Sequence, residues 1–202
     1  MIDLFPFFGL TAAAVNNGAD AARLLAIALT TIVLIQPAAA QTDGPCGLAV
    51  SLATEDDSRT TYSLAGLSAT ATAALVLLPG GSGFLDLDEQ GCPRKLKGNS
   101  LIRSRMLFHR RGFVTALVDA PSDYQKKDGL GGFRVTSRHA QDLGRVIEDV
   151  RRRTGLPVWL IGTSRGTISA ANTASRLLAD GAPDGLILTS PVTKGRQGGR
   201  KS

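Results

Sequence analysis

Blocks of apolar residues divide this chain into segments that predict strands and helices in turn. Continuous apolar runs at 73–78, 113–118, 157–161 and 185–189 are typical of strands buried on both faces of a parallel sheet. In the segment 137–154, apolar residues recur at intervals of three, four and three positions, which predicts an amphipathic helix. The residues expected on its inward face are Ala140, Leu143, Ile147 and Val150.

Two weaker patterns add a hairpin and a second helix. Alternating runs at 47–53 and 60–64 flank a polar turn and predict an opening β-hairpin. The segment 99–110 has helical content, and either Asn99 or Ser100 can cap its first turn. The residues expected on the inward face of this helix are Leu101, Ile102, Leu107 and Phe108.

The order of these segments predicts the fold class. Residues 124–133 are polar and rich in glycine, so they are expected to form a mobile surface loop. Elsewhere strand, loop and helix segments repeat along the chain, which requires right-handed crossovers between parallel strands. We therefore expect an α/β fold with a mainly parallel central sheet and flanking helices.

The segment 162–166, Gly-Thr-Ser-Arg-Gly, carries the clearest candidate chemistry. It joins the apolar run at 157–161 to an Ala-rich segment of helical period. Gly162 and Gly166 lack side chains, which lets strand and helix approach closely around a strained turn at Ser164. The helix is expected to begin at Ser164, with its free N–H groups facing any anion formed there. The alternative is that Ser164 is an ordinary helix N-cap in another α/β protein.

This strand, serine turn and helix resemble the nucleophile elbow of the α/β-hydrolase family, whose motif is G-x-S-x-G. The resemblance covers residues 48–192. It implies an α/β-hydrolase-like core in which Ser164 is the catalytic nucleophile. No cofactor is implied, because the serine chemistry of this family uses side chains and backbone N–H groups alone.

The same resemblance points to the glycine-rich loop 79–83. In α/β-hydrolases the loop after the third strand supplies one N–H group of the oxyanion hole, and here it reads Pro-Gly-Gly-Ser-Gly. The resemblance implies that the N–H of Gly81 or Ser82 acts together with the N–H of Arg165. The alternative is an ordinary glycine-rich turn.

The catalytic acid and base are harder to find. The resemblance implies an Asp or Glu and then a His after the nucleophile. After Ser164 the sequence offers Asp180 and Asp184, and no histidine. We therefore expect a truncated hydrolase that lacks the last strands of the fold. His139 is the one local candidate for a base, its alternative being an exposed helix histidine, and His109 is expected at the opposite end of the sheet.

The C-terminal residues indicate which kinds of macromolecular partner the protein can have. The segment 194–202 contains four basic residues and no acidic or apolar one, so it predicts a disordered tail. Removing that +4 from the net charge of +6 leaves +2, and so mild a charge does not favour a nucleic-acid partner. In a truncated sheet, the run at 185–189 would be an apolar edge strand, which predicts self-association through the open edge.

The N-terminal residues resemble a secretory signal. Arg23 precedes the apolar run 24–35, and small residues follow up to Ala40. We expect a leader and signal peptide over residues 1–40, cleaved after Ala40, and a secreted or periplasmic protein. The alternative is an N-terminal membrane anchor, although the run is shorter than the ~20 residues that span a bilayer. A partial hydrolase domain would then occupy residues 41–193.

Two cysteines, Cys46 and Cys92, are the only ones in the sequence. In an exported protein they can form a disulfide, and the alternative is two unpaired thiols. No Cys or His spacing indicates a metal site.

Together these patterns predict an exported serine hydrolase that acts through Ser164 on an ester or similar acyl bond of a small molecule. The alternative is a truncated or non-catalytic relative that binds a partner.

Overall fold

The computed structural model describes residues 46–126 and 128–192 of the 202-residue chain. The expected leader and signal peptide at 1–40 and the expected basic tail at 194–202 lie outside the described residues. Within the described part, no helix has both the length and the apolar content needed to cross a bilayer.

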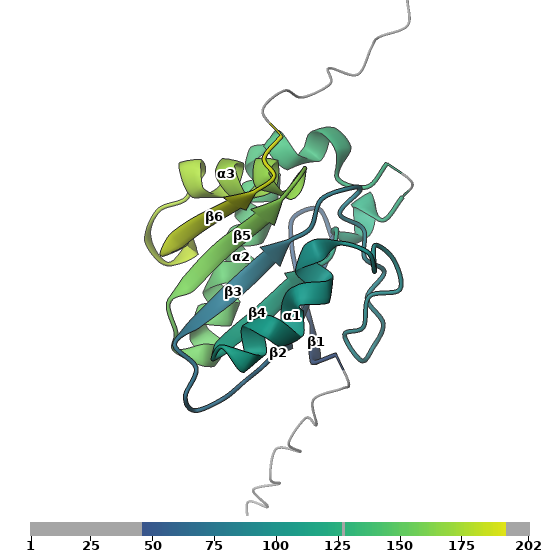
Figure 1. Ribbon diagram of the computed structural model, residues 1–202. Helices are drawn as coiled ribbons and strands as arrows, with labels where there is room; N and C mark the ends of the chain where they lie inside the picture. The colour runs from purple at the N-terminus through teal and green to yellow at the C-terminus, as the bar shows by residue number, and fades with distance from the viewer. Residues whose placement is uncertain (1–45, 127, 193–202) are drawn as a thin grey trace, which may run out of the picture. The chain divides into compact units, whose positions relative to one another are not determined.

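A six-stranded mixed sheet forms the centre of the fold, with the strand order β1-β2-β4-β3-β5-β6 (Figure 1). Strands β1 and β2 form the predicted hairpin, and β2 pairs antiparallel with β4. Strands β4, β3, β5 and β6 are mutually parallel, so the sheet is mainly parallel as predicted. The strands are β1 Leu48–Ala53, β2 Arg59–Ala65, β3 Ala73–Leu78, β4 Phe113–Val118, β5 Val158–Thr163 and β6 Gly185–Thr189.

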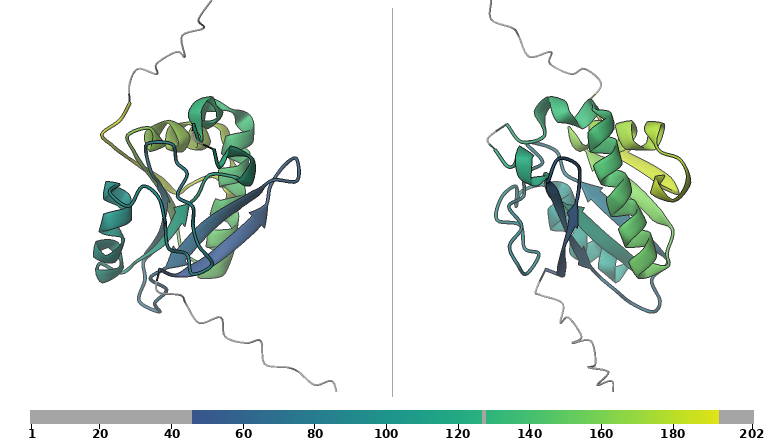
Figure 2. Two further views of the ribbon diagram at one scale, coloured as in Figure 1. Left: turned by 90° about the vertical axis from the view of Figure 1, so that its right-hand side faces the viewer. Right: turned by 180° about the vertical axis from the view of Figure 1, so that it is seen from behind.

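Helices cover both faces of the sheet. Figure 2 shows α1 on one face and α2 and α3 on the other. This layering confirms the predicted α/β class. The α-helices are α1 Ser100–Arg110, α2 Ser137–Thr154 and α3 Gly166–Arg176, and the 3-10 helices are η2 Ser122–Tyr124, η3 Gly131–Val135 and η4 Ala179–Gly181.

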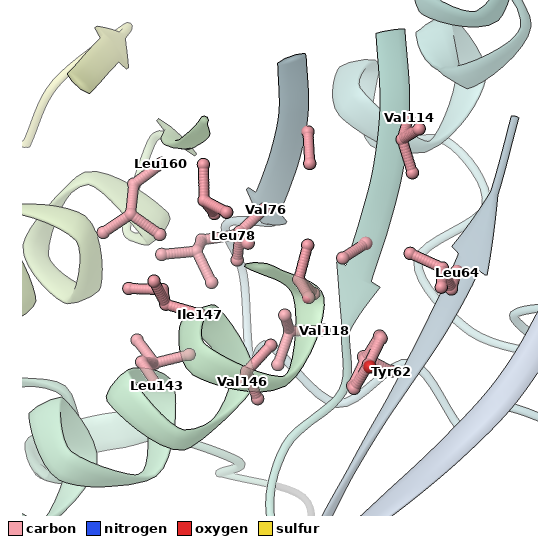
Figure 3. Packing of buried hydrophobic residues seen from close by; sticks show 14 of the residues in the cluster. Tyr62, Leu64, Val76, Leu78, Val114, Val118, Leu143, Val146, Ile147 and Leu160 are labelled. Carbon is pink, nitrogen blue, oxygen red and sulfur yellow. The ribbon is translucent and has the colours of Figure 1, made fainter. Parts of the chain in front are cut away.

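Helix α2 has the predicted bounds because its ends carry strong local signals. Thr136 caps the first turn by accepting a hydrogen bond from the N–H of His139. Gly155 ends the helix in the left-handed conformation that favours glycine. All four predicted inward residues are buried. Three of them, Leu143, Ile147 and Val150, belong to the largest apolar cluster. In this cluster α2 packs against side chains of the central strands (Figure 3).

The predicted inward face of α1 is partly wrong. Leu101 is buried, but Leu107 is 57% exposed. Arg105 is buried instead, because it lies one helical turn after Leu101 and its guanidinium reaches the carbonyl oxygen of Cys46 and the Oγ of Ser63.

Most described residues of the segment 124–133 are exposed, as its composition predicts, but two of its apolar side chains are not. Leu130 and Phe133 are buried and form a small apolar cluster with Ala120. The ring of Tyr124 stacks on that of Phe133, with 3.9 Å between ring centroids. This packing depends on residues nine positions apart meeting one another, which local composition does not encode.

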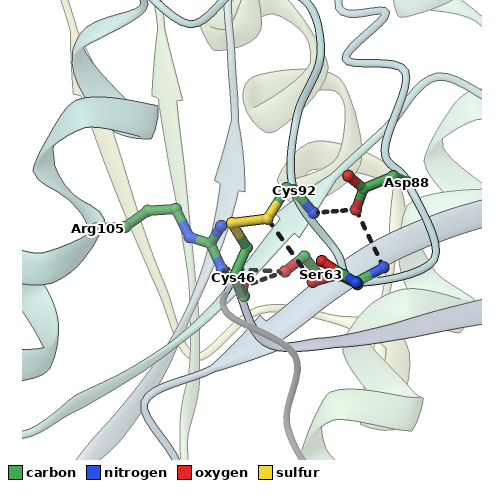
Figure 4. Close-up of a disulfide and its surroundings, with 6 residues drawn as sticks. Cys46, Ser63, Asp88, Cys92 and Arg105 are labelled. Atoms are coloured by element: carbon green, nitrogen blue, oxygen red, sulfur yellow. Dashed lines mark hydrogen bonds between the residues drawn. A yellow bond between two sulfur atoms is a disulfide. The ribbon is translucent and has the colours of Figure 1, made fainter.

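Cys46 and Cys92 form a disulfide, with Cα atoms 5.0 Å apart, and it ties the start of the hairpin to the loop that follows β3 (Figure 4). Hydrogen bonds surround the bridge. Arg105 and Ser63 both donate to the carbonyl oxygen of Cys46, and Asp88 accepts from the N–H of Cys92. The bridge is therefore embedded in a polar network between α1 and β2.

Strand β6 is the last strand of the sheet in the described part of the chain. Its residues Leu186, Ile187 and Leu188 are each between 38% and 41% exposed, and so is Trp159 of the neighbouring β5. Trp159 and Ile187 also line an apolar hollow of about 420 Å³ next to α1. The described residues thus leave this end of the sheet open to solvent.

Candidate active site

Ser164 occupies a sharp turn between β5 and α3. Its backbone has φ = 51°, in the left-handed region that side chains other than glycine rarely adopt. Helix α3 consequently begins at Gly166, two residues later than the predicted start at Ser164. The carbonyl oxygen of Ser164 accepts hydrogen bonds from the N–H and Oγ1 of Thr167, at 3.0 and 2.6 Å. The N–H of Ser164 donates to the carbonyl oxygen of Thr189.

The two glycines of the motif are placed where no side chain fits. A Cβ atom on Gly166 would lie 1.9 Å from the carbonyl oxygen of Leu78, at the end of β3. A Cβ atom on Gly162 would lie 2.7 Å from the carbonyl oxygen of Gly166. Distances this short are steric clashes, so glycine at both positions is what lets strand and helix approach around Ser164.

The glycine-rich loop after β3 lies directly beside Ser164. A Cβ atom added to Gly80 would lie 2.8 Å from the Cβ of Ser164 and 3.3 Å from its Oγ. The structure therefore brings the two glycine-containing segments singled out in the sequence into contact, although about eighty residues separate them.

Several backbone N–H groups near this contact have no hydrogen-bond acceptor within the described residues. Those of Gly81, Ser82 and Arg165 are among them. Gly81 has φ = 64°, which turns the peptide plane of the loop away from an extended course. Unpaired N–H groups from two segments beside one serine hydroxyl are the elements of an anion-binding site.

His139 is not positioned to act on Ser164. Its ring is buried, and its Nε2 lies 2.8 Å from the Oγ of Ser169, on the second turn of α3. Burial, together with the nearby Arg134 guanidinium, lowers the pKa of His139 to about 3. The alternative of an exposed helix histidine is also wrong, because the first turn of α2 packs against α3 rather than facing solvent.

His109 and the two late aspartates also lie away from the nucleophile. The Nε2 of His109 is 2.8 Å from the Oγ1 of Thr115, and burial lowers the pKa of this histidine. Asp184 accepts from the N–H of Val158, at the amino end of β5, whereas Ser164 follows its carboxyl end. Asp184 therefore lies at the end of β5 opposite to the one that Ser164 follows.

Asp119 follows the carboxyl end of β4, but its carboxylate is already engaged. It accepts hydrogen bonds from the N–H groups of Leu85, Leu87 and Ala120, at distances between 2.6 and 3.0 Å. Burial raises the pKa of Asp119, and these three bonds oppose that rise. Asp119 thus organises the segment after the glycine-rich loop.

Sequence reasoning missed a small buried cavity behind the site. It has a volume of about 10 Å³, near the minimum for one water molecule, and its lining includes Arg134, His139 and Asp142. Both carboxylate oxygens of Asp142 lack a hydrogen-bond partner within the described residues, and burial raises the pKa of this group to about 6. A signal was present: Asp142 and Asp149 lie two turns apart on the buried face of the amphipathic helix α2.

The described residues contain no group of three or more His, Cys, Asp or Glu side chains placed to hold a metal ion. The groups that the site itself presents are a serine hydroxyl, unpaired backbone N–H groups and the buried groups behind them.

Comparisons with known proteins identify the fold. No family model and no curated protein matches the chain. Among solved structures, it is similar to a monoglyceride lipase from Saccharomyces cerevisiae, with a TM-score of 0.53 at 14% identity over 77% of this chain and 48% of the lipase. It is also similar to a lipase/esterase from Lactobacillus plantarum, with a TM-score of 0.50 at 15% identity over 76% and 63% of the two chains. For esterase 2 from Thermogutta terrifontis the TM-score is 0.50 at 18% identity, over 73% and 57%.

These similarities show that the chain has the α/β-hydrolase fold, as its elbow motif predicts. The chain spans about half the length of the solved structures it matches.

Proposed function

We propose that the protein is a serine hydrolase that cleaves an ester or a similar acyl bond in a small molecule. One observation carries this proposal: Ser164 stands on a strained turn between β5 and α3, with unpaired N–H groups of the loop after β3 beside it. The fold supports it, because the structures similar to this chain include enzymes named as esterases and lipases.

In the proposed reaction, the Oγ of Ser164 attacks the carbonyl carbon of the acyl group. The carbonyl π electrons move to oxygen, and the N–H groups of Arg165 and of Gly81 or Ser82 stabilise the resulting oxyanion. Collapse of this intermediate breaks the bond to the leaving group and leaves an acyl-serine, which water then hydrolyses. Removal of one such N–H donor typically lowers the rate by ~10²–10³.

The reaction also needs a base that accepts the Ser164 proton and returns it to the leaving group. His109 and His139 are the two histidines of the sequence, and both bind other hydroxyl groups. We propose that the base and its orienting acid are contributed by groups other than these two.

The signal-like N-terminus supports export of the protein to the periplasm or the medium.

A non-catalytic binding function is the second candidate. It is favoured by the engagement of both histidines and by the exposed apolar residues of β6. In this role the elbow would remain as a structural turn, and the open end of the sheet would contact a partner.

A fluorophosphonate probe separates the two functions. Such probes phosphonylate activated serines, and the solved structure of Thermogutta terrifontis esterase 2 is itself phosphonylated by cyclosarin. We expect the wild-type protein to be labelled. A Ser175→Ala control should be labelled equally, because Ser175 is exposed near the far end of α3 and away from Ser164 in the sequence. We expect no labelling of Ser164→Ala. Absence of labelling in the folded wild-type protein would support the binding function instead.

A further inference from the structure

We propose that Arg134 is a positioning residue that locks the glycine-rich loop 79–83 against the elbow helix α3, and so aligns the oxyanion donors. This inference rests on the proposed function of the site for its catalytic consequence. Its structural part, the locking of the loop, can be tested separately from any activity.

The guanidinium of Arg134 lies between the two segments that meet at Ser164. One of its terminal nitrogens donates to the Oγ of Ser169 on α3, at 2.7 Å. The other donates to the carbonyl oxygens of Pro79 and Gly81, at 3.3 and 3.4 Å. A planar group with donors on both sides thus bridges the loop and the helix.

The loop is shaped to receive this side chain. A Cβ atom on Gly83 would lie 2.6 Å from a terminal nitrogen of Arg134, so the guanidinium occupies the space that a side chain would need there. The carbonyl oxygen of Ser82 accepts from the N–H of Leu130, and the N–H of Arg134 donates to the carbonyl oxygen of Leu130. The segment that carries Arg134 therefore holds the loop through its backbone as well.

The charge of Arg134 is buried without a carboxylate bound to it. The residue is 2% exposed, and its acceptors within the described residues are a hydroxyl and two carbonyl oxygens, all neutral. Burial and the nearby Arg165 lower the pKa of Arg134 to about 10, so the group remains a cation at neutral pH. A buried cation with neutral acceptors keeps its positive potential, which favours negative charge on the adjacent loop.

Neutral His139 completes the arrangement. Because the Oγ of Ser169 accepts from Arg134, the hydrogen of this hydroxyl is free to point to the Nε2 of His139. A protonated imidazole could not accept this bond and would place a second positive charge beside the guanidinium. The low pKa of His139 keeps the ring neutral over the physiological range.

The test compares Arg134→Met, which keeps an unbranched apolar stem and removes the charge and the donors, with Arg134→Lys, which keeps the charge. Arg138→Met is the matched control, because Arg138 lies four residues later, in α2, and pairs with Asp123 outside the site. Amide hydrogen exchange is followed by NMR at Gly83 and Leu130, which report on the loop. Gly91, whose N–H donates to the carbonyl oxygen of Asp88, is a reference outside the reach of Arg134.

We expect exchange at Gly83 and Leu130 to accelerate at least about tenfold in Arg134→Met, less in Arg134→Lys, and not in Arg138→Met, with Gly91 unchanged in all three. Unchanged exchange at the loop would overturn the inference. Equal acceleration at Gly91 would also overturn it, because Arg134 would then support general stability only.

The rate of fluorophosphonate labelling of Ser164 connects the lock to catalysis. We expect Arg134→Met to label at least about tenfold more slowly than the wild type, and Arg138→Met to match the wild type. Equal labelling rates in Arg134→Met and the wild type would overturn the catalytic part. If the wild type is not labelled at all, the proposed function fails, and the exchange measurement still decides whether Arg134 locks the loop.

Discussion

The carbonyl oxygen of Leu78 lies 1.9 Å from the point that a Cβ atom on Gly166 would occupy. The end of β3 and the start of α3 are thus in backbone contact, and this contact sets the glycine-rich loop beside Ser164. The geometry of the candidate site therefore depends on glycine at position 166 as well as on Ser164.

We expect Gly166→Ala to destabilise the protein by at least about 2 kcal/mol, because strand and helix must separate to admit one methyl group. The measurement is the free energy of unfolding in denaturant, followed by the fluorescence of Trp159, which is the only tryptophan of the sequence. The control is Gly132→Ala, whose added Cβ would meet no atom within 4 Å. Equal stabilities of the two variants would show that the elbow tolerates a side chain.

Replacing both Cys46 and Cys92 with serine is expected to cost about 4 kcal/mol of stability, because the bridge closes a loop between residues 46 positions apart. A reducing agent should destabilise the wild-type protein by a similar amount and leave the double variant unchanged. A reducing agent that does not shift the wild-type unfolding midpoint would argue against a stabilising role.

Asp142 is expected to make stability fall as the pH rises. Burial raises its pKa from 3.8 to about 6; Arg138 and Arg145 lower it, and Glu55 and Asp123 raise it. The folded state therefore holds a proton that the unfolded state releases above pH 4. At about 1.4 kcal/mol per pKa unit, the wild type loses up to about 3 kcal/mol relative to Asp142→Asn between pH 4 and pH 7.

Asp149→Asn is the matched control for this pH dependence, since Asp149 is buried on the same helix. Burial raises its pKa, but hydrogen bonds from Tyr62 and Arg153 outweigh that effect and hold the pKa below its ordinary value. Its contribution to stability is lost as the pH falls, so this variant should differ most from the wild type near pH 7 and least in acid. Parallel stability curves for the wild type and Asp142→Asn would contradict the prediction.

The outer edge of β6 is expected to mediate self-association. The strand presents Leu186, Ile187 and Leu188 without a charged residue between them, a pattern that favours pairing with another strand. We expect light scattering at micromolar concentration to detect dimers or larger species, and Ile187→Lys to shift the protein toward monomer. A monodisperse wild-type monomer would show that this edge does not associate.

The sequence determined those elements whose signals lie within a few residues. Strands β3, β4 and β6 have the predicted bounds, because continuous apolar runs ending in turn residues are unambiguous. The predicted burial is right for β3 and β4 and wrong for β6, whose side chains are largely exposed at the end of the described sheet. Helix α2 has the predicted bounds for a similar reason, since its apolar period and its terminal glycine agree. The glycines around Ser164 likewise mark a turn through local backbone sterics alone.

Only the tertiary structure decided which side chains meet. Arg105 is buried because its guanidinium reaches the carbonyl oxygen of Cys46, whereas Leu107 is exposed. Leu130 and Phe133 are buried because they form a cluster with Ala120. Arg134 and His139 join Ser169 across 35 and 30 positions of sequence. Such contacts depend on the relative placement of distant elements. A local pattern fixes the period and ends of an element, but not the neighbour against which it packs.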